Sequence, residues 1–244
     1  MLTYLRNREV IPLLILCTFS LLLRLIDLDQ PSFWINEADN TRFYFFETQR
    51  ERLAWGPPPI GLGFHTLAYL SISDLIPGGL VLESEAGFRI PAVIFFVIGL
   101  PLVFMLARRL VSYPLALGIT LLWSINPFGY HISRMFYSYS SWTVFSISSM
   151  LAFFHLTDAI KKNNVRPRNW ILFHATVIFA ISTNVFVILV MLCMVPHFIS
   201  TVFRHVEGNS LRLRTTISAL GPHIPVCILI SWDSVVNSHQ TVGE

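Results

Sequence analysis

Long apolar segments separated by short polar stretches run through the sequence from one end to the other. Each segment is close to the roughly 20 residues that a helix needs to cross about 30 Å of hydrocarbon. Segments that cross a membrane must be helical, because lipid cannot satisfy unpaired backbone polar groups. The pattern predicts apolar helices at 10–26, 59–76, 89–107, 113–130, 138–157, 170–186, 187–203 and 215–232. It therefore predicts an all-α polytopic membrane protein, with 1–244 forming a single transmembrane module.

Composition agrees with this pattern. Of the 244 residues, 54% are hydrophobic and only 13% are charged, against roughly 25% charged residues in soluble domains. So few charges could not cover the surface of a soluble enzyme of this size, and no basic, aromatic-rich face for nucleic acid is present. The three cysteines lie in apolar segments, where a thiol behaves as a small hydrophobe. Neither they nor the histidines have metal-ligand spacing, so we expect no metal site from the residues alone.

The N-terminal segment resembles a signal peptide in one respect, because Arg6 and Arg8 precede its apolar stretch. No small-residue cleavage site follows. We therefore expect an uncleaved signal anchor whose N-terminus is cytoplasmic. Arg24 lies near the outer end of this segment, and we expect its long side chain to extend to the membrane interface.

The distribution of Lys and Arg predicts the orientation, because cytoplasmic loops carry an excess of both. If 59–76 lies on the membrane without crossing it, 11 of the 17 basic residues are cytoplasmic. They are Arg6, Arg8, Arg108, Arg109, Lys161, Lys162, Arg166, Arg168, Arg204, Arg212 and Arg214. If 59–76 crosses, only four are cytoplasmic. We therefore expect about seven transmembrane helices, with the bundle at 89–232 and a non-cytoplasmic first loop at 28–88 that holds interfacial helices.

The first outer loop is both acidic and aromatic, which is typical of a segment at headgroup depth. Within it, Asn36, Glu37 and Asp39 stand at the start of a stretch that can form an interfacial helix from 38 to 53. Acids near a helix N-terminus are stabilised by the helix dipole. That explanation is sufficient for Glu37 or Asp39 taken alone, and a role as a catalytic base is the alternative.

Two arginines on the expected outer side are candidates for binding an anion. Arg89 follows Glu85 by four residues, so a surface ion pair is the simpler explanation of its place. Arg134 lies in a polar turn with His131 and Tyr139. A guanidinium binds phosphate oxygens bidentately, so Arg134 is a candidate anchor for a lipid phosphate. A side chain that extends to the interface from a helix end is the alternative.

The order of short motifs resembles a known family. A first span ending in Arg-Leu is followed by FWINEA, PPP, SEAGFRIPA, ARRL, NPF, SRMFYSYS and STNVF. This order is similar to the N-terminal module of the C-type (GT-C) membrane glycosyltransferases, especially the bacterial branch related to protein mannosyltransferases and the aminoarabinose transferase. The similarity covers about 23–186. It implies an integral protein of the bacterial plasma membrane. Other members of the family continue through further spans, so we expect the chain to be truncated relative to them.

The resemblance implies transfer of a sugar from a polyprenyl-phosphate donor to an acceptor hydroxyl on the non-cytoplasmic side. The family's proposed base stands where this chain has Asn36, so Glu37 or Asp39 would have to replace it. The resemblance places Arg89, Arg134 and Tyr139 on residues that the family keeps at the donor, and Asn184 on its histidine. With His131 of the same polar turn as Arg134, these are the expected substrate-binding residues. Membrane lipid and the lipid-linked sugar are the expected partners. No cofactor is implied with certainty, and whether a divalent metal takes part is left open.

The chain departs from the family's pattern at three positions. Asn36 replaces an aspartate, Tyr137 replaces an arginine, and Asn184 replaces a histidine. A carboxamide is not a base at physiological pH, so a second hypothesis is a non-catalytic relative that binds lipid-linked sugar or scaffolds a membrane partner. A transporter is a third hypothesis. It is less favoured, because the sequence has neither inverted repeats nor ionisable residues near the middle of spans.

Overall fold

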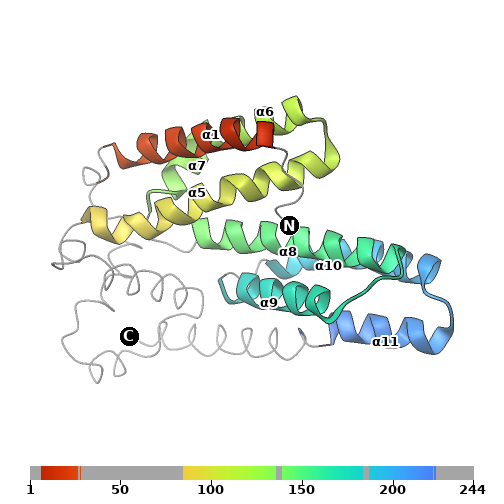
Figure 1. The fold of residues 1–244 in the computed structure, drawn as a ribbon. Helices are drawn as coiled ribbons and strands as arrows, with labels where there is room; N and C mark the ends of the chain where they lie inside the picture. The colour runs from red at the N-terminus through yellow and green to blue at the C-terminus, as the bar shows by residue number, and fades with distance from the viewer. Residues whose placement is uncertain are drawn as a thin grey trace, which may run out of the picture. The chain divides into compact units, whose positions relative to one another are not determined.

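The computed structural model describes residues 7–26, 28, 85–135, 139–183, 187–221 and 223. Their regular elements are helices, and no strand occurs among them (Figure 1). The helices are α1 (Asn7–Leu25), α5 (Glu85–Leu110), α6 (Tyr113–Ile125), α7 (Pro127–Ile132), α8 (Tyr139–Lys161), α9 (Pro167–Thr183), α10 (Val187–His205) and α11 (Asn209–Leu220). The all-α prediction is confirmed for this part of the chain.

Three described helices are long and apolar enough to cross a membrane. They are Arg89–Leu110 within α5, the whole of α8 and the whole of α10. The chain is therefore an α-helical membrane protein, but its described part does not provide the seven spans that we expected. Residues 29–84 of the outer loop, including 59–76 and the predicted interfacial helices, lie outside the described residues. The division at 28–88 and 89–232 stays a prediction.

The continuous helix expected at 113–130 is wrong, because the structure divides it at Asn126. Pro127 lacks an N–H and disfavours helical geometry at the residue before it. Asn126 accordingly has an extended ψ of 125°, and its side-chain oxygen accepts a hydrogen bond from the backbone N–H of Phe128 at 2.9 Å. Asn126 thus ends α6 and caps α7. At 13 residues, α6 is too short to cross about 30 Å by itself.

Helix boundaries differ from the expectation at two further places. The segment predicted at 170–186 is α9, which starts at Pro167, a residue type favoured in the first turn of a helix. The segment predicted at 215–232 begins as α11 at Asn209 and includes Arg212 and Arg214. α11 covers only the first residues of the predicted segment, most of which lies outside the described residues, so the span at 215–232 stays a prediction.

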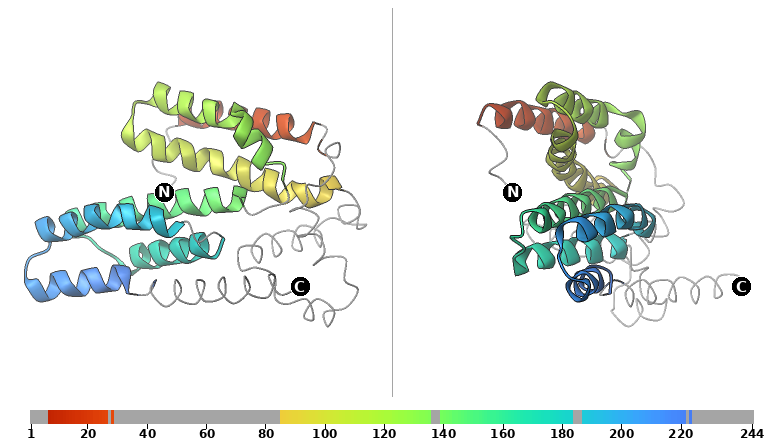
Figure 2. Two further views of the ribbon diagram at one scale, coloured as in Figure 1. Left: turned by 180° about the vertical axis from the view of Figure 1, so that it is seen from behind. Right: turned by 90° about the vertical axis from the view of Figure 1, so that its right-hand side faces the viewer.

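The chain divides into two compact units, Met1–Ile147 and Ser148–Glu244, and α8 begins in the first unit and ends in the second. In the first unit, α1, α5 and α6 contact one another, and α7 follows the end of α6 (Figures 1 and 2). In the second unit, α10 contacts both α9 and α11.

Polar contacts at both ends of α1 show that α1 and α5 are antiparallel. At one end, Arg108 Nη2 in the last turn of α5 donates to Glu9 Oε1 in the first turn of α1, at 3.3 Å. At the other end, Arg89 Nη1 near the start of α5 donates to the carbonyl of Leu28, just after α1, at 2.9 Å. Between these contacts, Leu13, Phe104, Ala107 and Ala116 form a buried apolar core.

The second unit is centred on aromatic side chains. Phe153 of α8 lies 5.7–6.2 Å, ring to ring, from Phe154, Phe173, His197 and Phe198. We call these five residues the Phe153 cluster. The contacts of Phe153 thus join α8, α9 and α10.

Candidate functional site

The described site candidates all belong to the first unit, at the end where α1 stops. They are Arg89, His131, Arg134 and Tyr139. The predicted base positions Asn36, Glu37 and Asp39 lie outside the described residues, and so does Asn184. The described residues therefore include only the substrate-binding candidates of the predicted site, without Asn184, and none of its base candidates.

Arg89 is in the protein interior, with 1% of its surface exposed. Its hydrogen bond to the Leu28 carbonyl joins the chain after α1 to the first turns of α5. Arg89 is therefore not a surface residue, but the Glu85 side chain is not among the described ones, so the ion pair between the two stays a prediction. In this structure Arg89 holds two segments together rather than presenting its charge on an open surface.

Arg24 is the residue whose role the sequence analysis missed. We expected its side chain to extend to the interface, and that expectation is wrong, because Arg24 is 0% exposed. Its Nε donates to Ser133 Oγ at 2.7 Å, and its Nη2 donates to the Ser124 carbonyl at 2.8 Å. Its Nη1 donates to both the hydroxyl and the carbonyl of Ser20, at 2.7 and 3.2 Å. The guanidinium carbon also lies 3.7 Å from the centre of the Phe96 ring.

The depth of Arg24 explains why it is satisfied internally. Fifteen residues of helix, about 22 Å, separate Glu9 from Arg24, whereas the hydrocarbon is about 30 Å thick. If the Glu9–Arg108 pair lies at one interface, Arg24 lies several ångströms short of the other. A charge at that depth must have protein partners. Ser20 was a readable signal, because it stands four residues before Arg24 and therefore on the same helix face.

The charge of Arg24 is balanced by helix ends. Within the described residues, all of its acceptors are neutral oxygens. Those oxygens belong to Ser20, one turn before Arg24 in α1, to Ser124 in the last turn of α6, and to Ser133, the residue that ends α7, while Arg24 itself lies in the last turn of α1. A helix C-terminus carries roughly half a negative charge on its unpaired carbonyls, which a cation stabilises. Three helix C-termini thus converge on one guanidinium, and none of the oxygens that accept from Arg24 in the described part of the chain belongs to a carboxylate.

Arg134 is linked to Arg24 through the short helix α7. The Ser133 hydroxyl, which accepts from Arg24, donates to the Tyr130 carbonyl at 2.9 Å. The Tyr130 hydroxyl in turn accepts a hydrogen bond from Arg134 Nη1, and the Arg134 guanidinium carbon is 4.9 Å from the centre of the Tyr130 ring. We call the set of Ser20, Arg24, Phe96, Ser124, Tyr130 and Ser133 the Arg24 cluster. Unlike Arg24, the half-buried Arg134 is partly open to its surroundings.

His131 and Tyr139 lie on either side of Arg134 in the chain. His131 is exposed, and its carbonyl accepts from the Arg134 backbone N–H at 3.1 Å. Tyr139 is half-buried at the start of α8, where its carbonyl accepts from Thr143 Oγ1 at 2.9 Å. The described site thus offers a guanidinium, an imidazole and a phenol near one another in the chain, all of which can donate to phosphate oxygens.

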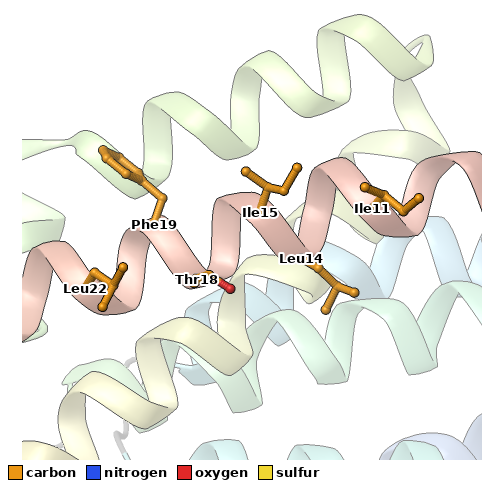
Figure 3. Close-up of a pocket in the computed structure, with 6 residues that line it drawn as sticks. All are labelled: Ile11, Leu14, Ile15, Thr18, Phe19 and Leu22. Atoms are coloured by element: carbon orange, nitrogen blue, oxygen red, sulfur yellow. The ribbon is translucent and has the colours of Figure 1, made fainter.

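The outer face of α1 is apolar. Ile11, Leu14, Ile15, Phe19 and Leu22 are 49–65% exposed, and with Thr18 they line a shallow groove of ≈ 450 Å³ along the helix (Figure 3). Such a stripe would be unfavourable in water but is normal where a helix contacts lipid chains. The groove supports a membrane environment for α1.

Within the described residues, no group of three or more His, Cys, Asp or Glu side chains could hold a metal ion. The nearest approach of two histidines is in the second unit, where His174 Nδ1 lies 3.1 Å from His223 Nε2 and the His174 ring stacks on Trp170. That spacing is a hydrogen bond between two rings.

Comparison of the chain with known protein families, with curated proteins and with solved structures finds no match. The resemblance to C-type glycosyltransferases therefore remains a prediction carried by the motifs of this sequence.

Proposed function

We propose that this protein binds a polyprenyl-phosphate-linked sugar at the non-cytoplasmic side of the membrane and transfers the sugar to an acceptor hydroxyl. The observation that carries the proposal is the cationic end of the first unit. Arg24 and Arg89 are buried where α1 ends and make hydrogen bonds within the protein, whereas Arg134, which follows α7, is partly open and lies near His131 in the chain. A lipid phosphate needs such donors, both when it is bound and when it leaves with added negative charge.

Transfer requires a proton acceptor as well as cations. The acceptor oxygen would form a bond to the anomeric carbon while the bond from that carbon to the phosphate oxygen breaks. The hydroxyl proton would pass to a carboxylate, and the polyprenyl phosphate would leave. In this chain Asn36 stands at the position of the family's base, so Glu37 or Asp39 would have to take the proton.

We also propose a topology in which the N-terminus is cytoplasmic and seven helices cross. The antiparallel arrangement of α1 and α5 supports it, because 59–76 then need not cross between them. In this topology α6 and α7 together make one crossing. The start of α6 lies near the Glu9 end of α1, because Tyr113 packs on Phe104, and the end of α6 lies near Arg24, because the Ser124 carbonyl accepts a hydrogen bond from it. Single cysteines at Gly79 and Lys162 should then react with an impermeant reagent from opposite faces. Reaction of both from one face would contradict the topology.

The proposed activity is tested with the purified full chain in phosphatidylcholine nanodiscs. Polyprenyl phosphate should bind, polyprenol without the phosphate should not, and Arg134→Gln should weaken binding. With a radiolabelled polyprenyl-phosphate hexose and a mixture of membrane acceptors, Asn36→Asp should raise transfer by up to roughly 10²-fold, because it restores a positioned base. Glu37→Gln should lower any turnover of the parent. No binding by the parent would overturn the proposal.

A second candidate function is a non-catalytic relative that binds the same lipid. Asn36 is the observation that favours it, since an amide cannot take the acceptor's proton. Binding of polyprenyl phosphate by the parent and by Asn36→Asp, without transfer by either, would establish this candidate instead.

A further inference from the structure

We infer that Arg24 is a positioning residue that sets the place of the Arg134 guanidinium for the lipid phosphate. The inference deepens the proposed function and rests on it. Arg24 itself cannot touch a ligand in this structure, because it is fully buried and its N–H groups donate to Ser20, Ser124 and Ser133. Its effect on the ligand must therefore pass through other residues.

The connection from Arg24 to Arg134 consists of three consecutive contacts. Arg24 Nε donates to Ser133 Oγ at 2.7 Å, and that hydroxyl donates onward to the Tyr130 carbonyl at 2.9 Å. The Tyr130 hydroxyl then accepts from Arg134 Nη1. The Arg24 guanidinium also lies 5.9 Å from the centre of the Tyr130 ring. Tyr130 is thus held from the Arg24 side by its carbonyl and its ring, and it holds Arg134 by its hydroxyl.

Electrostatics give Arg24 a second effect on the same site. Arg134 directly follows the C-terminal end of α7, and the ends of α1 and α6 are also close to Arg24. Exposed carbonyls at three helix C-termini would repel a phosphate. Arg24 donates to the Ser124 carbonyl at the end of α6 and to the Ser133 hydroxyl at the end of α7, so its positive charge offsets this repulsion where Arg134 lies.

Geometry and charge can be separated by substitution. Arg24→Lys keeps the charge but cannot reach three acceptors with a planar fork. Arg24→Gln removes the charge as well. Ser133→Ala leaves Arg24 in place and removes the hydroxyl that connects it to Tyr130. Arg108→Gln is the matched control, because Arg108 lies at the opposite end of α5 and pairs with Glu9.

The experiment measures the Kd and stoichiometry of polyprenyl phosphate with the full chain in phosphatidylcholine nanodiscs. Arg24→Lys should weaken binding about tenfold, as expected for loss of one charge-assisted hydrogen bond at Arg134. Arg24→Gln should weaken it further, and Ser133→Ala by a smaller factor. Arg108→Gln should leave the Kd unchanged. In an Arg134→Gln background, Arg24→Lys should have no additional effect on the Kd.

A merely structural role for Arg24 gives a different result. It would lower the fraction of protein that binds, with an unchanged Kd in the molecules that do, and this result would overturn the inference. So would additive effects of Arg24→Lys and Arg134→Gln. If both Arg24 variants fail to fold, Ser133→Ala becomes the test of the inference. A Kd of Ser133→Ala equal to that of the parent would contradict it. Absence of binding by the parent instead overturns the proposed function and the inference with it.

Discussion

Arg24 in the first unit and Phe153 in the second are both buried at the centre of a cluster, but different forces hold the two clusters together. Arg24 is held by hydrogen bonds of fixed direction to serine hydroxyls and helix-end carbonyls. Phe153 is held by ring contacts at centroid distances of 5.7–6.2 Å. Hydrogen bonds require particular atoms in particular places, whereas ring packing requires mainly volume and shape.

A membrane environment increases the difference between the two clusters in how much a substitution costs. Lipid tails are as apolar as aromatic side chains, so packing Phe153 against other rings gains little from exclusion of water. An unpaired guanidinium or carbonyl in hydrocarbon has no such substitute partner. We therefore expect substitutions in the Arg24 cluster to cost more than substitutions of similar size in the Phe153 cluster. Four predictions follow that comparison from the largest effect to the smallest.

Arg24→Ala should have the largest effect on stability. It leaves the buried oxygens of Ser20, Ser124 and Ser133 without their donor, and we expect a loss of about 3 kcal/mol in the free energy of unfolding. The measurement is an SDS titration in mixed micelles. Arg24→Met, which retains the chain length without donors, should be nearly as destabilised. If Arg24→Met were as stable as the parent, packing rather than hydrogen bonding would hold together the helix ends around Arg24.

Phe153→Ala should cost less, about 2 kcal/mol, because it leaves a cavity among rings without stranding a polar group. Phe153→Leu should cost less than about 1 kcal/mol, since most of the volume is kept. Leu189→Ala, at a site that is 58% exposed on α10, is the control and should be close to neutral in the same titration. A Phe153→Ala loss larger than that of Arg24→Ala would reverse the comparison.

Gly129→Ala tests how tightly the ring beside Arg24 is held. A Cβ there would lie 3.3 Å from the Trp123 carbonyl and 3.4 Å from Phe96. Neither neighbour can withdraw easily, because one is backbone and the other packs on the guanidinium. We expect a loss of about 1 kcal/mol. Gly118→Ala in α6, with nothing within 4 Å of the new Cβ, should instead stabilise by up to about 1 kcal/mol through helix propensity.

Arg108→Gln should have the smallest effect. Arg108 is 37% exposed and its pair with Glu9 is 3.3 Å long, so we expect a change of about 0.5 kcal/mol or less. Because a partly exposed pair is screened by salt, the difference from the parent should shrink further at high ionic strength. If Arg108→Gln lost several kcal/mol in the free energy of unfolding at every ionic strength, this pair would stabilise the protein as much as the hydrogen bonds of Arg24 do.

Composition and segment length were sufficient to predict the class of this protein and most of its described helices. The scarcity of charge required a membrane, and lipid permits only internally satisfied backbone, so helices followed from composition and segment length. The apolar segments at 10–26, 89–107, 138–157 and 187–203 correspond to α1, α5, α8 and α10. The division at Asn126 could also have been anticipated, because an Asn-Pro pair inside an apolar run is a readable breaker.

Which arginine is buried, and which groups balance its charge, depends on how the helices pack against one another. From the sequence, Arg24 and Arg134 both stand near helix ends, and both can extend toward an interface. Their difference depends on contacts across 100 and 109 residues, from Arg24 to Ser124 and Ser133, which no local pattern encodes. Helix ends attract a cation only once packing has brought them together, so the site around Arg24 exists because of the fold and not because of any motif.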